Sequence, residues 1–163
     1  MTSRRSRPQK PGPGQESVWD YPRPPRVEPV EARVTIELDG RVIAETSRAV
    51  RVLETSHPPV YYLPREAFID GSLQPAAGSS VCEFKGQALY LSVGSADRAA
   101  WFYPAPAAGY EELADRVAVY PGLMDRCTVG GEVVTAQEGD FYGGWITAAI
   151  VGPFKGAPGT WGW

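Results

Sequence analysis

The chain has 163 residues, of which 43% are hydrophobic and 21% are charged, and its formal net charge is -3. This length leaves too little surface for a second independent core, so we expect one globular domain. Four cations near the start, Arg4, Arg5, Arg7 and Lys10, have no acidic residue among them, which leaves about -7 on the rest and argues against a nucleic-acid partner.

The first 17 residues are rich in Pro, Gly, Ser and Arg, a composition that cannot bury enough apolar area to offset chain entropy. We therefore expect a disordered basic arm over 1–17 and a single domain over 18–163. The arm lacks the apolar centre of a secretory signal, and no stretch approaches the roughly 20 apolar residues of a membrane span. These features predict a cytoplasmic protein with no membrane partner.

The domain is predicted to consist of short strands, because the chain's 18 glycines and 16 prolines recur without a collagen-like period and are typical of many turns. Residues 18–30 predict an extended surface segment anchored by Trp19 and Tyr21. Next, apolar and polar residues alternate in "ARVTIELDGRVIAET" on either side of Asp39-Gly40, a pair that tolerates the positive φ of a hairpin turn. Similar patterns predict an antiparallel meander over 82–93, 99–104, 126–137 and 141–152. Helical patterning is confined to 109–118 and 64–69.

The closing stretch, "FYGGWITAAIVGPFKGAPGTWGW", has Lys155 as its only charge. It predicts one long final strand, or two joined at a bend, at the centre of a sheet, where Gly143 and Gly144 permit a close backbone approach or a bulge. The loop after it is expected to pack over the core, with Trp161 and Trp163 as plugs.

Five separated segments carry a family resemblance: "DYPRPPRVE", "RVLETSHPPVYYLPRE", "CEFKGQALY", "AAWFYPAP" and the closing stretch. In this order they resemble the bacterial and fungal family labelled domain of unknown function 427, over about residues 19–163. That family also carries a nucleotidyltransferase-like name. The sequence does not support the name, since it has neither a Gly-Ser dipeptide followed by paired Asp ligands nor a Walker-type loop.

The resemblance implies a mainly β fold with antiparallel sheets in a β-tent (Mss4-like) arrangement and one or two short helices. In the methionine sulfoxide reductase B group, Mss4-like zinc proteins and the ligand-binding domain of cereblon, two sheets lean together and ligands sit between them. This chain has no C-x-x-C pair, and Cys82, Cys127 and His57 offer only three zinc ligands. We expect no metal, no cofactor and, in the cytosol, no disulfide.

The densest polar cluster is "RVLETSHPPVYY". In an extended chain Arg51, Leu53 and Thr55 face one way while Val52, Glu54 and Ser56 face the other. The single histidine, His57, lies next to two prolines, which suits a positioned acid or base, although it could equally close a turn through one hydrogen bond. Neighbouring Ser56 is poorly placed to form a hydrolase dyad with it.

The remaining candidates are a cation, a thiol and the aromatic rings. Lys85 could stabilise an anion and lower the pKa of Cys82, or the two could be a solvated lysine and a small buried thiol at a hairpin tip. Arg51 could hold a ligand carboxylate or phosphate, or merely pair with Glu54 on the surface. Most rings must fill the core, but some could line a pocket, for which we select Trp101, Trp145, Tyr62 and Tyr142.

Three functions follow as hypotheses. The first is a small-molecule-binding domain with an aromatic-lined pocket between two sheets, bound by Arg51, Tyr62, Trp101, Tyr142 and Trp145. The second is a cofactor-independent hydrolase, isomerase or lyase, in which Glu54 or His57 exchanges a proton and Lys85 or Arg51 stabilises negative charge. The third is a protein-interaction module docking through the C-terminal aromatics. Nothing in the sequence indicates the oligomeric state.

Overall fold

The computed structural model describes residues 7–139 and 141–163, and its fold is mainly β, as predicted. The strands are β1 (Glu16–Ser17), β2 (Arg26–Pro29), β3 (Val34–Leu38), β4 (Arg41–Thr46), β5 (Val50–Leu53), β6 (Val60–Pro64), β7 (Leu73–Cys82), β8 (Gly86–Val93), β9 (Ala96–Phe102), β10 (Arg116–Val119), β11 (Arg126–Val129), β12 (Glu132–Val133), β13 (Thr135–Ala136), β14 (Trp145–Ile146) and β15 (Ile150–Val151). The short 3-10 helices are η1 (Val18–Asp20), η2 (Arg65–Ala67), η3 (Glu111–Leu113) and η4 (Pro121–Leu123). Within these described ranges, no helix is long and apolar enough to cross a membrane.

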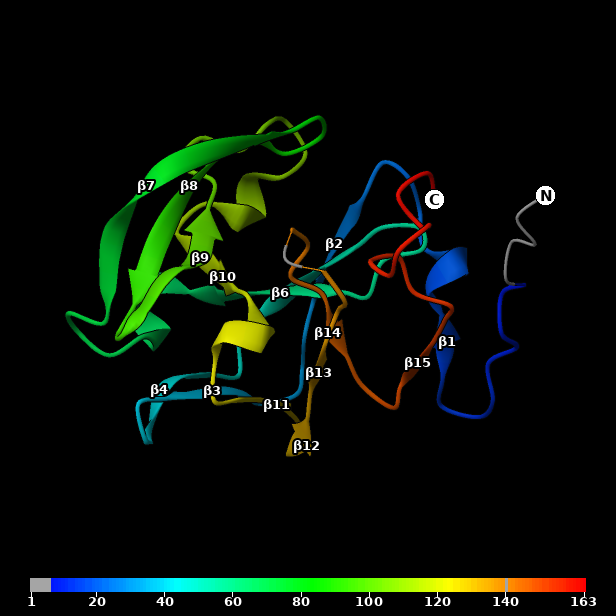
Figure 1. Cartoon of the computed structure of the whole chain (residues 1–163), viewed down its shortest axis with the longest axis horizontal. Coiled ribbons are helices and arrows are strands. Elements are labelled where there is room, and N and C mark those ends of the chain that lie inside the picture. The colour runs from blue at the N-terminus through cyan, green and yellow to red at the C-terminus, as the bar shows by residue number, and fades with distance from the viewer. Residues whose placement is uncertain (1–6, 140) are drawn as a thin grey trace.

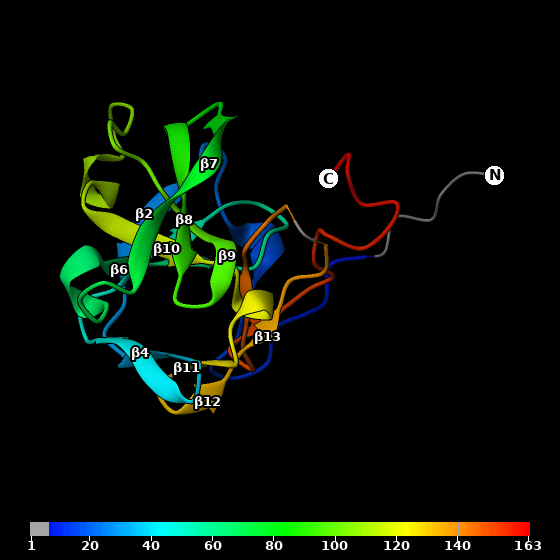
Figure 2. The same ribbon diagram turned by 60° about the vertical axis from the view of Figure 1, so that its left-hand side comes forward.

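Two antiparallel sheets form the body of the molecule. The larger has seven strands in the order β2-β5-β6-β10-β9-β8-β7, and the smaller has four in the order β12-β11-β3-β4. Figure 1 shows the four-stranded sheet along the bottom and the β7–β10 part of the larger sheet above it, and Figure 2 shows the same separation after rotation. The segments after β12 run along one side of both sheets, together with β1.

The hairpins predicted from turn residues are confirmed. Asp39 and Gly40 have φ values of 56° and 76°, and they join β3 to β4. Gly130 and Gly131 likewise have positive φ and join β11 to β12. Both turns need the left-handed backbone that glycine and aspartate adopt most readily, so local sequence alone specifies them.

The central strands of the seven-stranded sheet bury side chains on both faces, because successive residues of a strand point to opposite sides. On β6, Tyr61 and Leu63 enter the core shared with the four-stranded sheet, while Tyr62 enters a second cluster on the opposite face. The shared core is largely aliphatic and contains Val34, Ile36, Ile43, Leu63, Leu91, Val93, Val117 and Val119. The second cluster is largely aromatic and contains Tyr62, Trp101, Tyr103 and Tyr110. We call the first side the core face and the second the concave face.

The helical segment expected over 109–118 is shorter than predicted. Only Glu111–Leu113 is helical, as a single 3-10 turn, and β10 begins at Arg116. Asp115 has a φ of 59°, which ends the helical turn, and the alternating Val117 and Val119 then favour a strand. The segment expected over 64–69 likewise contains only the 3-10 turn η2.

The basic arm differs from the expectation of disorder over 1–17. Residues 1–6 lie outside the described part of the chain, but the Gln9 amide donates to the carbonyl of Gly152 at 2.8 Å. Strand β1 pairs in parallel with β15, so Glu16 and Ser17 belong to the folded body. The anchors act as predicted, since the Trp19 indole donates to the carbonyl of Pro153 at 2.9 Å and Tyr21 is buried.

The closing stretch is not the central strand that its low charge suggested. It forms two short strands in different small sheets: β14 pairs with β13, and β15 pairs with β1. The low charge has another cause: Gly143 and Gly144 form irregular chain before β14, and they and Trp145 pack directly against the body of the protein. Glycine there removes side chains that would otherwise collide with their neighbours.

Candidate functional site

A cavity of about 230 Å³ opens on the concave face, and we call it the inner pocket. It is not the predicted space between the two main sheets, because the aliphatic core fills that space. Six of the residues selected from the sequence line it: Glu54, His57, Tyr62, Lys85, Trp101 and Tyr142. The topology therefore brings together side chains from β6, β9, the β7–β8 turn and the closing stretch.

Glu54 and His57 form a hydrogen-bonded pair at the rim of β5. The strand ends at Leu53, and the amide of His57 then donates to the carbonyl of Glu54 at 3.0 Å, closing a tight turn through Ser56, which has a φ of 71°. His57 Nε2 lies 3.3 Å from Glu54 Oε2, and the imidazole makes an edge contact with Tyr142 at 4.8 Å between ring centroids. His57 thus closes a turn through its backbone while its side chain faces the pocket.

The electrostatic environment keeps Glu54 ionised. Burial acts to raise its pKa, but the hydrogen bond and charge of His57, together with the charges of Lys85 and Arg23, outweigh burial and hold the pKa below its ordinary value. The ionised carboxylate accepts a hydrogen bond from Nε2 of His57, so Nδ1 is the ring nitrogen that Glu54 does not engage.

Lys85 supplies a cation to the same pocket from the turn between β7 and β8. Its Nζ lies 5.8 Å from the ring centroid of Tyr103. Burial acts to lower the pKa of Lys85, but Tyr62, Cys82 and Glu54 outweigh burial and raise the pKa above its ordinary value. The ammonium is therefore charged at neutral pH, which suits an anion-stabilising group and does not suit an amine nucleophile.

Aromatic rings make the floor of the pocket. The indole of Trp101 donates to the hydroxyl of Tyr62 at 3.3 Å, and the two rings meet edge to face. Tyr120 lies 4.6 Å from Trp101 between centroids, and Tyr103 lies 6.3 Å from Tyr62. Trp101 is only 8% exposed, so this floor is fixed by packing before any ligand arrives.

The closing stretch supplies the opposite wall, and its glycines are required there. A Cβ on Gly143 would overlap the Trp101 ring, and one on Gly144 would overlap Gln137 and Pro58. The close approach predicted for both glycines is thus confirmed. The amide of Gln137 donates to the carbonyl of Lys155 at 2.7 Å and its oxygen accepts from Gly144 at 3.0 Å, which ties the wall together.

Two predicted ligand-binding residues lie elsewhere. Arg51 alternates away from Val52 and Glu54, so it faces the opposite side of β5, where it binds Glu28 at 2.6 Å and Glu16 at 2.8 Å. These ion pairs therefore link β1 and β2 to β5. Trp145 is completely buried in the aliphatic core and stacks on Tyr61 at 4.8 Å between centroids. Alternation was predicted correctly for residues 51–54, but the partners of Arg51 come from distant sequence.

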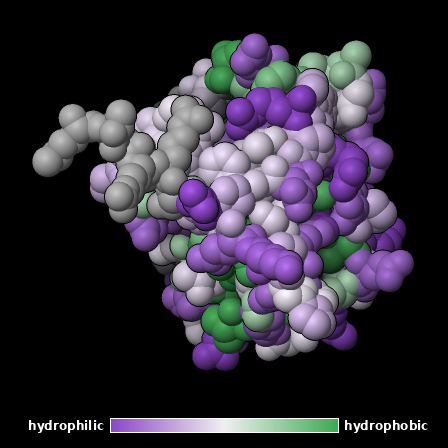
Figure 3. Space-filling model, turned by 90° about the vertical axis from the view of Figure 1, so that its right-hand side faces the viewer, coloured by the Kyte–Doolittle hydropathy of each residue, from purple (hydrophilic) through white to green (hydrophobic). Residues whose placement is uncertain are grey.

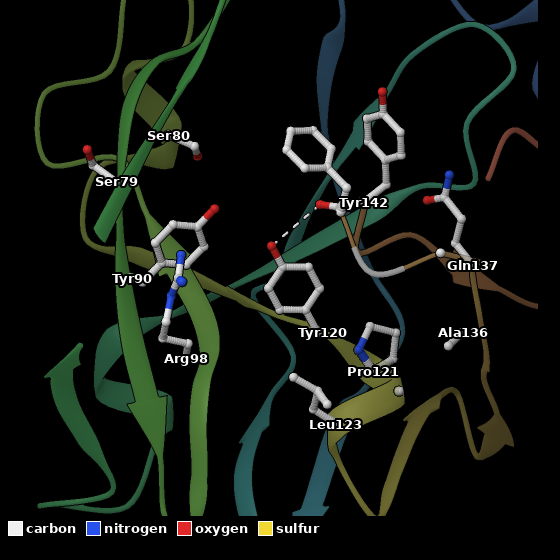
Figure 4. A pocket seen from close by; sticks show the side chains of 13 residues that line it. Ser79, Ser80, Tyr90, Arg98, Tyr120, Pro121, Leu123, Ala136, Gln137 and Tyr142 are labelled. Atoms are coloured by element: carbon white, nitrogen blue, oxygen red, sulfur yellow. Dashed lines mark hydrogen bonds between the residues drawn. The ribbon is translucent and has the colours of Figure 1, made fainter. Parts of the chain in front are cut away.

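A second hollow, the outer pocket, adjoins the first and has a volume of about 680 Å³. The two share Ser80, Tyr90, Tyr120, Phe141 and Tyr142. Figure 4 shows Tyr90 and Arg98 on one side of it, Tyr120 and Pro121 in the middle, and Gln137 on the far side. The site residues predicted from the sequence did not include Tyr90, Tyr120 or Arg98. Strand alternation relative to Trp101 could have found Tyr90, but nothing local in the sequence marks Arg98.

The C-terminal aromatics are mixed in their burial. Trp163 is half-buried and lies 5.2 Å from the ring of Trp19, so it covers part of the surface. Trp161 is 59% exposed and is not the plug that was predicted. In Figure 3, which faces this side of the molecule, hydrophobic residues are scattered and do not gather into one patch.

In the described ranges, no three His, Cys, Asp or Glu side chains lie close enough together to hold a metal ion. Cys127 is buried in the aliphatic core, while Cys82 lines the inner pocket.

Comparison with known proteins gives a family without a described activity. A search of curated proteins found no match. A family model described as Domain of unknown function (DUF427) matches residues 26–130, a shorter span than the resemblance expected over 19–163. The matched span includes Glu54, His57, Lys85 and Trp101 but not Tyr142 or Lys155. Because the match covers more than half of the chain, this protein belongs to the DUF427 family.

Proposed function

We propose that this protein is a small-molecule-binding β domain whose ligand occupies the inner pocket. The observation that carries the proposal is the convergence of an aromatic floor with a few polar groups, which is the usual composition of a small-molecule site. Trp101 and Tyr120 offer ring faces, Lys85 offers a cation, and the Glu54–His57 pair offers an acceptor. The β-tent arrangement suggested by the family resemblance is part of this proposal.

This composition favours a planar organic ligand. Trp101, Tyr120 and Tyr62 all line the cavity, and aromatic rings in a pocket wall are the groups against which a flat ligand packs. A polar substituent on that ligand can accept from Lys85 or donate to the ionised Glu54. The cavity of about 230 Å³ limits the part that enters it to one or two fused rings.

The test is a screen of planar aromatic acids and heterocycles by thermal shift, followed by calorimetry on Tyr142→Ala. Tyr142 sits on the wall, where its loss costs little packing, and it contacts His57. We expect a ligand whose affinity falls at least about tenfold in this variant. The matched control is Trp161→Ala, since Trp161 is exposed, lies next to Tyr142 and does not line the pocket. Equal losses in both variants, or no ligand in a broad screen, would count against the proposal.

A second candidate is a cofactor-independent enzyme, which the Glu54–His57 contact of 3.3 Å in the same cavity as Lys85 specifically favours. In such a reaction Glu54 would hold the ring with Nε2 protonated, His57 Nδ1 would take a proton from the substrate, and Lys85 would stabilise the resulting anion. Deuterium exchange into carbonyl acids in D2O, followed by NMR, tests this reaction. Exchange that persists in both His57→Gln and Glu54→Gln would exclude it.

A further inference from the structure

Two irregularities in the large sheet lie on either side of Tyr90. In β7 the pairing with β8 skips from Pro75 to Ser79, so three residues face the single Tyr90. In β9 the pairing with β8 skips between Ala96 and Ala100, so three residues face the single Ser92. Bulges of this kind re-aim side chains and are frequent beside functional sites.

The bulge in β9 fixes the direction of Arg98. Ser92 Oγ accepts the Arg98 amide at 3.2 Å and donates to Asp97 Oδ1 at 2.7 Å, so one hydroxyl holds both bulged residues. Arg98 itself has a φ of 49°, a left-handed conformation that non-glycine residues adopt at a cost. A backbone held in an unfavourable conformation by its own hydrogen bonds indicates that the position of this side chain is maintained.

The bulge in β7 leaves room for the guanidinium. The Arg98 Cζ lies 4.3 Å from the centroid of the Tyr90 ring, and Figure 4 shows the side chain against that ring. Gly78, at the end of the β7 bulge, has a φ of 99°, and a Cβ there would lie 3.1 Å from Arg98 Nη2. The guanidinium thus rests between an aromatic ring and a bare backbone, and stacking reduces its freedom before a ligand binds.

Arg98 also gives the outer pocket its charge. Among the described residues that line this pocket, Arg98 alone is charged, and its neighbours there are rings and the hydroxyls of Ser79 and Ser80. A planar, stacked guanidinium presents its donors as a fork that matches the two oxygens of a carboxylate or a phosphate. The outer pocket is continuous with the inner one through Tyr90 and Tyr120, which line both.

We infer that Arg98 is the oxyanion subsite for an extended ligand, whose planar group lies in the inner pocket and whose carboxylate or phosphate lies in the outer one. This inference rests on the proposed function and adds the ligand class to it. A tether joins the two ends and runs past Tyr90 and Tyr120. Ser80, which pairs with Ala88 of the concave-face cluster and lines both pockets, places its hydroxyl on the same side.

The experiment uses a matched pair of probes, 5-(2-naphthyl)pentanoate and its neutral amide, titrated into the full chain by calorimetry. The wild type should bind the carboxylate at least about tenfold more tightly than the amide. In Arg98→Gln the preference should fall to within about twofold, with the affinity for the amide unchanged. Arg41→Gln, an exposed arginine on β4, is the matched control and should keep the preference. A naphthylbutyl phosphate tells a phosphate site from a carboxylate site.

The outcomes separate the two proposals. If the amide and the carboxylate bind the wild type equally, the anion subsite is wrong while the inner pocket still binds planar groups. The subsite is equally wrong if Arg98→Gln keeps the preference and Lys85→Met abolishes it, because the anion then lies in the inner pocket. If neither probe binds the wild type, both proposals fall.

Discussion

The two faces of the seven-stranded sheet are built from the same strands but in different ways. On the core face, Leu63, Val93 and Val117 are completely buried and pack against the four-stranded sheet. On the concave face, Tyr62 and Trp101 keep polar atoms that bond to each other beside an open cavity. The side chains of the core face are closely packed, whereas several rings of the concave face line a cavity. We therefore expect stability to depend mainly on the core face and the proposed binding to depend mainly on the concave face.

The largest expected effect concerns the core face. Trp145→Ala removes a completely buried ring that stacks on Tyr61, and we expect the free energy of unfolding to fall by about 3–5 kcal/mol. Urea denaturation followed by circular dichroism measures this loss. Trp161→Ala, the exposed counterpart, should stay within about 0.5 kcal/mol of the wild type. A small loss for Trp145→Ala would contradict the division between the faces.

The rates at which a reagent modifies the two cysteines offer a second comparison of the faces. Burial, and then Glu37, raise the pKa of Cys127 on the core face to about 12, whereas Cys82 is half-buried and lines the inner pocket. A disulfide reagent at pH 8 should therefore modify Cys82 at least about 100-fold faster than Cys127. Cys82→Ser and Cys127→Ser allow each thiol to be followed alone. Similar rates in the two variants would show that the core face opens easily.

Arg51 offers a further test of the difference between the two faces. It was expected to bind ligand, but it lies on the side of β5 that faces away from the inner pocket. Arg51→Met removes its ion pairs with Glu28 and Glu16, and we expect a loss of about 2 kcal/mol in unfolding free energy. Affinity for naphthylpentanoate should change less than about twofold. Tyr142→Ala should do the reverse. A large loss of affinity in Arg51→Met would connect the two faces.

The smallest expected effect is the pH dependence of Glu54. Its pKa in the folded protein lies below the ordinary 4.5, so its contribution to stability is present above that value and is lost as the pH falls through the folded pKa. Glu54→Gln should be less stable than the wild type at pH 7, by at most about 1 kcal/mol because solvent screens the pair. The difference should shrink at pH 3.5. Denaturation at both pH values measures it, and a difference independent of pH would contradict a stabilising ionised Glu54.

Local patterns in the sequence were sufficient for the hairpins and for one part of the site. Asp39-Gly40 specifies its own turn, and alternation in β5 places Val52 and Glu54 on the pocket side. The face of Trp145 could not be predicted, because β14 has only two residues and so offers too little alternation to orient the side chain. Arg98 depends on the register of two neighbouring strands, which only the assembled sheet determines.

The pairing of β1 with β15 determines when the pocket can be completed during folding. Glu16 and Ile150 are joined by almost the whole length of the chain, and closing such a long loop is entropically costly until the intervening sheet has formed. Two rings of the floor lie on strands that pair with a near neighbour in the sequence: Tyr62 on β6, which pairs with β5, and Trp101 on β9, which pairs with β8. We therefore expect the floor to form early and the wall that carries Tyr142 and Lys155 to dock late. A chain arrested between these steps would have an ordered sheet with one side of its site missing.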